Sequence, residues 1–281
     1  MRHLKVYNKQ DLLILTRLRR FETKLGERLQ VVNDVNDLEK SLQESTAKFV
    51  ILGIPEDMGV KANLGKGGAG TAWFPFLQAF FNIQSNDFLE GSNILMLGHF
   101  DFEEMEALIE RNAGSDEEKI EAYRHAINAI DDEVEHAVKL ITQHDKIPVV
   151  IGGGHNNAYG CIKGAAKGLY KAGKTALAQI NAINLDAHAD YRPLEGRHSG
   201  NAFRYADEDG YLEKYCVVGL HENYIPQNCW IDIVSDPFLD VITYEDIFIH
   251  EKRSFIQAVA HATGFTEDAW CGIEIDLDSI E

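Results

Sequence analysis

The sequence predicts an α/β protein in which helices cover both faces of a mostly parallel sheet, giving a three-layer α/β/α arrangement. The first observation is a series of short, nearly continuous apolar runs, which are typical of strands buried on both faces. The second is that segments with apolar residues at helical spacing lie between several of these runs, as parallel strands require. The apolar runs cover residues 49–54, 94–97, 147–151, 182–185, 216–220, 239–242 and 272–275.

The helices between these runs differ in how clearly the sequence marks them. The clearest spans 116–144, where apolar residues recur every three or four positions and where Ser115 with Glu118 form a capping-box sequence. The charged residues on its other face fit a solvated surface. A second helix is expected directly after His155, and a third over about 251–263.

The chain is expected to form a single domain over residues 1–281. No Pro/Ser-rich linker, low-complexity tract or internal repeat divides the sequence. Residues 1–48 combine charge with apolar residues at helical spacing, so we expect an N-terminal segment of one or two helices. Residues 49–281 would then form the core of the fold.

Charge and composition exclude several classes of protein. The 281 residues include 27 Lys and Arg against 45 Asp and Glu, for a formal net charge of −18. This acidity argues against binding nucleic acid or an anionic membrane through a basic patch. The cysteines form no Cys-x-x-Cys pair, and the sequence has no signal-peptide pattern and no apolar run of the roughly 18 residues that span a membrane. We therefore expect a soluble, cytoplasmic protein with no nucleic-acid or membrane partner.

Residues that can carry chemistry repeatedly follow the predicted strands, at the sheet edge where α/β proteins bind ligands. The block Gly-Gly-Gly-His at 152–155 lies between a strand and a helix. It matches neither the phosphate-binding pattern G-x-x-x-x-G-K-[ST] nor the dinucleotide-binding pattern G-x-G-x-x-G, which disfavours a nucleotide-binding protein. Taken alone, a histidine after glycines is more often structural than functional.

Two acidic motifs change this interpretation. Asp186, His188 and Asp190 alternate after a strand, so their side chains point to one side of an extended chain. Asp276 and Asp278 share a face after the last strand, a pattern that by itself also fits a capped turn. Carboxylates brought together repel one another unless a cation compensates. With four carboxylates, two imidazoles and no thiolate, the set suits two Mn²⁺ ions better than Zn²⁺, and such a pair acidifies a shared water. The residues thus predict a dinuclear metallohydrolase.

In this order, the motifs resemble those of the ureohydrolases, the family of arginase, agmatinase and formimidoylglutamase. The resemblance rests on the blocks at 152–155, 186–190 and 276–278. Residues 53–69 also look like the family's first strand and loop, so the resemblance runs from about residue 49 to the end. It implies an arginase-like fold.

The resemblance also implies the ligands of two Mn²⁺ ions per chain. They are His155 and Asp190 for one ion, His188 and Asp278 for the other, and Asp186 and Asp276 as bridges. A hydroxide between the ions would attack the carbon of a guanidinium or formimino group. Asp190 is the catalytic candidate among these ligands.

The loop after the second motif resembles the family's substrate loop. Ser199 and Asn201 match a Ser-Gly-Asn sequence that helps arginases to bind substrate, but Phe203 stands where arginases carry a proton-shuttling histidine. His198 is a second catalytic candidate as its replacement, although a loop histidine without a role is the simpler interpretation. Arg192 matches formimidoylglutamases, where arginases carry Asn, and suits bidentate capture of a substrate carboxylate. The alternative is a surface ion pair with a neighbour such as Glu195.

These features favour a hydrolase that converts N-formimidoyl-L-glutamate to glutamate and formamide. Arginase or agmatinase activity on a guanidino substrate is the alternative within the family, and a catalytically silent member with a binding role is the alternative from another class. The resemblance further implies a homo-oligomer. In this family more strands and helices follow the third motif, together with an acidic residue that binds guanidinium. We therefore expect residues 1–281 to lack a C-terminal part of the fold, leaving an exposed sheet edge and a site open on one side.

Overall fold

The computed structural model describes residues 1–280, and its strands form two hydrogen-bonded sheets. The strands are β1 Leu4–Val6, β2 Gln30–Val31, β3 Phe49–Ile54, β4 Ile94–Phe100, β5 Ile147–Gly152, β6 Ile180–Leu185, β7 Leu212–Leu220, β8 Leu239–Thr243 and β9 Cys271–Ile275. The first sheet has the order β1-β4-β3-β5 with β2 also paired to β4, and the second has the order β8-β7-β6-β9. Among the described strands, every pairing is parallel except that of β1 with β4. The predicted α/β class with parallel strands is confirmed.

The helices also follow the predicted order. They are α1 Lys9–Leu15, α2 Leu25–Arg28, α3 Leu38–Glu44, α4 Met58–Ala62, α5 Trp73–Phe80, α6 Glu103–Asn112, α7 Asp116–Gln143, α8 Asn157–Lys171, α9 Ala202–Glu208, α10 Gln227–Ser235 and α11 Phe255–Thr266. The clearest prediction, 116–144, is α7, whose first turn is capped when the Ser115 side chain accepts a bond from the Glu118 N–H. The predicted 251–263 helix is α11, which begins only at Phe255 because Ser254 caps it there.

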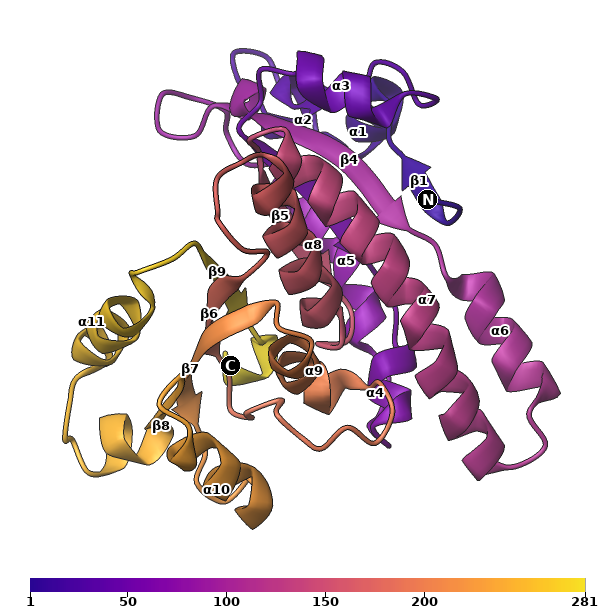
Figure 1. The fold of residues 1–281 in the computed structure, drawn as a ribbon. Coiled ribbons are helices and arrows are strands. Elements are labelled where there is room, and N and C mark those ends of the chain that lie inside the picture. The colour runs from indigo at the N-terminus through magenta and orange to yellow at the C-terminus, as the bar shows by residue number, and fades with distance from the viewer. Residues whose placement is uncertain (281) are drawn as a thin grey trace.

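Helices lie over both faces of each sheet, which gives the three layers (Figure 1). The edge strands β5 and β9 are less covered, since Ile147 and Ile273 are 43% and 74% exposed. Along β3, Leu52 belongs to the core formed with α7, and Ile51 belongs to the core formed with α1, α2 and α5. Along β7, Val217 packs with α8 and α9, whereas Val218 packs with α11. Successive side chains of a strand point to opposite faces. Burial of both faces is therefore the reason that these strands are continuous apolar runs in the sequence.

Two features differ from the sequence-based expectation. Within residues 1–280 the strands pair in two sets instead of one. The strands β5 and β9 are each the last paired strand of their set. The segment 1–48 contains three helices, where one or two were expected, and also β1 and β2, which both pair with β4. These strands have three and two residues, which is too short for a periodic pattern. Their pairing with β4, which the local sequence does not encode, defines them.

Helix α8 packs closely on α7 along a row of glycines. A Cβ at Gly164 would lie 2.7 Å from the backbone oxygen of Glu135, and a Cβ at Gly168 would lie 1.8 Å from Oγ1 of Thr142. Glycines four residues apart lie on the same face of a helix. Since α8 begins just after His155, this close approach also sets the position of the turn that carries His155.

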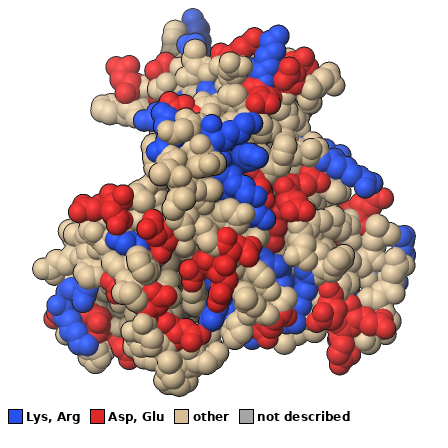
Figure 2. Space-filling view, in the orientation of Figure 1, with Lys and Arg blue, Asp and Glu red and all other residues tan. Residues whose placement is uncertain are grey.

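Acidic and basic side chains are interspersed over the face shown in Figure 2, and acidic groups gather at its lower right, where α6 and α7 lie in Figure 1. Both helices have acidic residues in their first turn, which the helix dipole favours. Within residues 1–280, no helix has the length and apolar character needed to cross a membrane.

The contact between α7 and α8 predicts opposite effects for the same substitution at two helical glycines. Gly164→Ala should lower the free energy of unfolding by about 1–3 kcal/mol, because its methyl group would press on the backbone of α7. Gly264→Ala in α11 is the matched control, since no described atom lies within 4 Å of a Cβ there. That change should stabilise the protein by about 0.5–1 kcal/mol through helix propensity. Urea unfolding of both variants measures the difference, and equal stability would contradict the close packing.

Candidate metal centre

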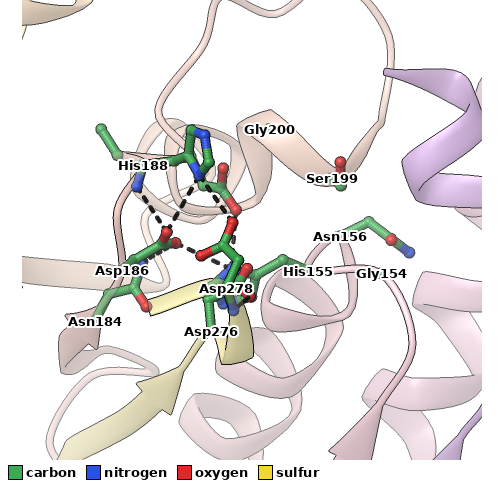
Figure 3. A network of polar contacts seen from close by, with 12 residues as sticks. Gly154, His155, Asn156, Asn184, Asp186, His188, Ser199, Gly200, Asp276 and Asp278 are labelled. Atoms are coloured by element: carbon green, nitrogen blue, oxygen red, sulfur yellow. Dashed lines mark hydrogen bonds and ion pairs between the residues drawn. The ribbon is translucent and has the colours of Figure 1, made fainter. Parts of the chain in front are cut away.

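The six predicted ligands lie together where the ends of three strands meet. All of them except Asp190 are labelled in Figure 3. His155 is in the turn between β5 and α8, while Asp186 follows β6 and Asp276 follows β9. Strands β6 and β9 are parallel neighbours with Leu185 opposite Ile275, so the residues after them emerge at the same edge of the sheet. Helix packing and strand register therefore bring three distant parts of the sequence to one place.

The ligand atoms form two groups, each with all its atoms within 4.8 Å of one another. In the first group, Nδ1 of His155 lies 2.9 Å from Oδ2 of Asp190, 3.2 Å from Oδ2 of Asp276 and 3.3 Å from Oδ2 of Asp186. In the second group, Nδ1 of His188 lies 3.1 Å from Oδ2 of Asp278 and 3.6 Å from Oδ1 of Asp186. Asp186 belongs to both groups, as a bridging ligand would.

The carboxylates hold positive charge at both imidazoles. Burial alone would lower the pKa of His155, but contacts with the three carboxylates around Nδ1 outweigh it and raise the pKa well above its ordinary value. Contacts with Asp186 and Asp278 raise the pKa of His188 to about 10. Burial raises the pKa of Asp190 to about 6. A divalent cation can replace the protons on both imidazoles and satisfy the same carboxylates, so the donor set fits such an ion.

Asp186 is the most constrained member of the cluster, because it is fully buried. Its Oδ1 accepts a bond from the backbone N–H of His188, and its Oδ2 accepts one from Nδ2 of Asn184, at 2.7 and 2.9 Å. The hydroxyl of Tyr215 lies 3.0 Å from the same Asn184 nitrogen and donates to the carbonyl of Ala189. These bonds fix the orientation of the Asp186 carboxylate without a metal ion.

Phe203 packs beneath the cluster. It is fully buried, its ring meets the imidazole of His155 edge to face at a centroid distance of 5.3 Å, and it stacks on Tyr215 at 4.3 Å. Phe203, which stands where arginases carry a proton-shuttling histidine, thus packs against the candidate ligand His155 and has no group that could transfer a proton.

A cavity of about 460 Å³ opens beside the ligands, and its wall includes Arg192, Ser199 and Tyr224. Arg192 and Ser199 were both predicted to bind substrate, and the structure places both at the cavity. Nε and Nη2 of Arg192 also donate to Oε1 of Glu195, at 3.2 and 2.8 Å, so the ion pair named as the alternative is present as well. The guanidinium is half-exposed and can exchange this partner for a ligand.

His198 and Asn201 are not among the residues that line the cavity, so the geometry gives no support to their predicted roles. His198 is fully buried, its Nδ1 accepts a bond from the N–H of Gly200, and its Nε2 donates to Glu195. Burial lowers its pKa to about 4, which leaves the ring neutral. Asn201 is also fully buried, and its side-chain oxygen accepts bonds from Arg197 and from the backbone of His198. Both side chains shape the loop and have no free group to offer a substrate.

Three further residues were given no role from the sequence. Asn63 lines the cavity and donates to the hydroxyl of Ser199 at 3.3 Å. Tyr224 stacks on the ring of His188 at 5.2 Å. Glu56 is buried under the turn at 152–155, where it accepts bonds from Asn157 and from the N–H of Gly59. Asn63 and Glu56 lie in the segment that resembles the family's first loop, whereas Tyr224 belongs to no motif.

The comparisons with known proteins agree with this geometry. The sequence profile of the arginase family matches residues 47–281. The chain belongs to the arginase family. A formimidoylglutamase from Streptococcus pyogenes is 24% identical over 253 residues, which are 88% of this chain and 69% of that protein.

Solved structures share this fold. The formimidoylglutamase from Bacillus subtilis has a TM-score of 0.67 at 16% identity, covering 96% of this chain and 77% of that one. The formiminoglutamase from Trypanosoma cruzi, solved with Mn²⁺, has a TM-score of 0.58 at 19% identity, covering 92% of this chain and 83% of that one. The resemblance inferred from the three motifs, and the arginase-like fold that it implied, are confirmed.

The buried, neutral ring of His198 predicts a loss of stability in mild acid. Its pKa in the folded protein is below the ordinary value, at about 4, so between about pH 6.5 and 4 the unfolded chain binds a proton that the folded chain does not. This contribution to stability is present above pH 6.5 and is lost as the pH falls. Urea unfolding at pH 7.5 and 5 should therefore show a smaller drop for His198→Gln than for the wild type. The exposed His250, changed to Gln, is the control, and equal pH dependence of all three proteins would contradict the assignment.

Proposed function

We propose that this chain is a Mn²⁺-dependent hydrolase that cleaves a C–N bond of a linear amidine, with N-formimidoyl-L-glutamate as its substrate. The observation that carries the proposal is the cavity of this arginase-family chain, which joins a cluster of imidazoles and carboxylates to the guanidinium of Arg192. The names of the relative from Streptococcus pyogenes and of the structural neighbours give the same direction.

We assign two Mn²⁺ sites to each chain. The proposed ligands are His155 and Asp190 for one ion, His188 and Asp278 for the other, and Asp186 and Asp276 between them. The two overlapping groups of donor atoms, which share Asp186, support this number. Ions held there supply Lewis-acid activation of water and offset the charge that develops on the amidine.

The chemistry adds one water molecule to the substrate. The oxygen of water bonds to the formimino carbon, the bond from that carbon to the glutamate nitrogen breaks, and a proton passes to the leaving nitrogen, giving glutamate and formamide. Asp190 is the proposed catalytic carboxylate, because it lines the cavity as a member of the donor group around His155. Arg192 is proposed to bind a substrate carboxylate, for which it must leave Glu195. The hydroxyl of Ser199 lies in the same wall.

A guanidino substrate is the second candidate, and one observation favours it. Arg192 already has a carboxylate partner in Glu195, so the arginine does not require a substrate carboxylate for its neutralisation. A substrate without a carboxylate, such as agmatine, would leave this pair in place.

Two broader expectations belong to the same proposal. We infer a cytoplasmic location, which is supported by a family of metabolic hydrolases and by the finding that no helix within residues 1–280 could cross a membrane. We also infer a homo-oligomer from the family resemblance. Gel filtration with light scattering measures the oligomeric state.

The shared position of Asp186 predicts how metal binding responds to substitution. Wild-type protein should retain close to two Mn²⁺ per chain after dialysis, and Asp186→Asn should lose most of both, because this carboxylate belongs to both donor groups. Asp101→Asn is the matched control, since Asp101 also follows a strand but pairs with Lys5 outside the cluster. Elemental analysis measures the content. A folded wild-type protein without metal, or an Asp186→Asn variant with full content, would contradict the assignment.

The wall residue Arg192 predicts the substrate preference. Among formimidoylglutamate, arginine, agmatine and guanidinobutyrate, assayed with Mn²⁺, we expect turnover of formimidoylglutamate. Arg192→Ala should raise KM for that substrate at least tenfold, which is about 1.4 kcal/mol, with little change in kcat. Arg204→Ala is the control, because Arg204 pairs with Asp232 and is not part of the cavity wall. Turnover of agmatine alone, unaffected by Arg192→Ala, would favour the guanidino alternative, and no product from any compound would refute the activity.

A further inference from the structure

Arg197 connects three segments that meet beside the metal centre. Its side chain is 3% exposed. Nε and Nη2 donate to the two oxygens of Asp131 on α7, at 2.9 and 3.2 Å. Nη2 also donates to the carbonyl of Asn156 at 2.8 Å, and Nη1 donates to Oδ1 of Asn201 at 2.9 Å. One guanidinium therefore contacts the long helix, the residue next to His155, and the end of the loop from which Ser199 and Gly200 line the cavity.

Two tyrosine rings also contact the guanidinium. The central carbon of Arg197 lies 4.6 Å from the ring centroid of Tyr159 and 4.9 Å from that of Tyr205. Tyr159 belongs to α8 and Tyr205 to α9, so the stacking adds two more elements to the same contact. The two rings meet each other edge to face, so they contact the guanidinium from adjacent sides. Together with its directional N–H bonds, these contacts leave it little freedom to rotate or shift.

A buried ion pair of this kind is a weak source of stability. Asp131 and Arg197 are both almost completely removed from water, and the cost of removing two charges from water is comparable to their attraction. Apolar side chains of similar size could fill the same space. Unlike apolar contacts, the hydrogen bonds of the ion pair are directional, so they fix the angles at which α7, Asn156 and Asn201 meet.

The contacts of Asn201 extend this geometry to the cavity wall. Nδ2 of Asn201 donates to the carbonyl of Gly196, and its Oδ1 accepts the N–H of His198 as well as Arg197. The N–H of Arg192 donates to the carbonyl of Gly200, at 3.0 Å. The position of the loop, and of the backbone of Arg192, thus depends on the bond between Arg197 and Asn201.

We propose that Arg197 is a positioning residue that fixes the substrate loop, residues 198–201, relative to the metal ligand His155. The proposal rests on the function proposed above. Arg197 acts on the site through Asn156 and Asn201 and does not touch the substrate. Because His155 belongs to only one of the two donor groups, the loss of Arg197 should affect one metal site and leave the other.

The first test is Arg197→Lys, which removes the planar set of guanidinium N–H donors but keeps the positive charge. A lysine ammonium cannot bond both oxygens of Asp131 and also reach Asn156 and Asn201. In titrations with Mn²⁺, Arg197→Lys should weaken one ion at least tenfold and leave the other within about twofold, and KM should rise at least tenfold. Arg204→Lys is the matched control, because Arg204 is also paired, with Asp232, and lies over a ring, that of Tyr191, but has no bond to the loop or to Asn156.

The second test covers a lysine variant that does not fold. The pair Arg197→Met with Asp131→Leu removes both charges together, so neither is left buried alone, and its melting temperature should stay close to that of the wild type. The same selective loss of one Mn²⁺ and the same rise in KM are expected. Crystal structures of wild type and variant should show residues 198–201 displaced from His155.

The outcomes separate this proposal from the proposed function. Equal weakening of both ions together with a lower melting temperature would mean that Arg197 is only structural and would overturn the proposal. Unchanged Mn²⁺ affinities, KM and loop position would overturn it as well. Failure of the wild type to bind Mn²⁺ or to form product would refute the proposed function. The loop position in the two crystal structures would still decide the role of Arg197.

Discussion

The contact of one buried carboxylate, that of Asp186, with two imidazoles is the interaction on which the site depends. A carboxylate without water must receive hydrogen bonds and positive charge from the protein or from an ion. Here the backbone of His188 and the side chain of Asn184 supply the bonds, and the two histidines supply the charge. The parallel register of β6 with β9 and the packing of α8 on α7 are the parts of the fold that make this meeting possible.

Helix α7 is the rigid element behind the site. It is 28 residues long, and its buried face packs against α4 and α8. The same helix supplies Asp131 to the guanidinium of Arg197. The turn that carries His155 and the loop that carries Ser199 are therefore both held in place by contacts with α7. This explains how segments far apart in sequence keep a fixed spacing around the cavity.

The sequence predicted the strands well, and it singled out six candidate metal ligands that the fold brings together, for a physical reason in each case. Strands buried on both faces must be apolar along their whole length, and ligands that point to one side of an extended chain must alternate, so 186–190 and 276–278 could be recognised locally. The loop 198–201 could not be interpreted in this way. His198 and Asn201 have residue types that suit substrate binding, but they bond to Glu195 and Arg197 within the same loop. Arg197 is in turn held by Asp131 of α7, so tertiary contacts decide whether these side chains face the cavity or the core. Tyr224 was missed for the same reason, since its contact with His188 joins loops after two different strands.

The candidate metal centre takes its ligands from both sets of strands that pair within residues 1–280. His155 follows the last strand of the first sheet, whereas Asp186 and Asp276 follow strands of the second, and within residues 1–280 no backbone ladder connects the two sheets. A cation held by donors from both sets would join the ends of these strands at one point. Binding to this arrangement and not to a separated one stabilises the joined state by mass action, so the occupancy of the site and the alignment of the two halves of the molecule are thermodynamically linked.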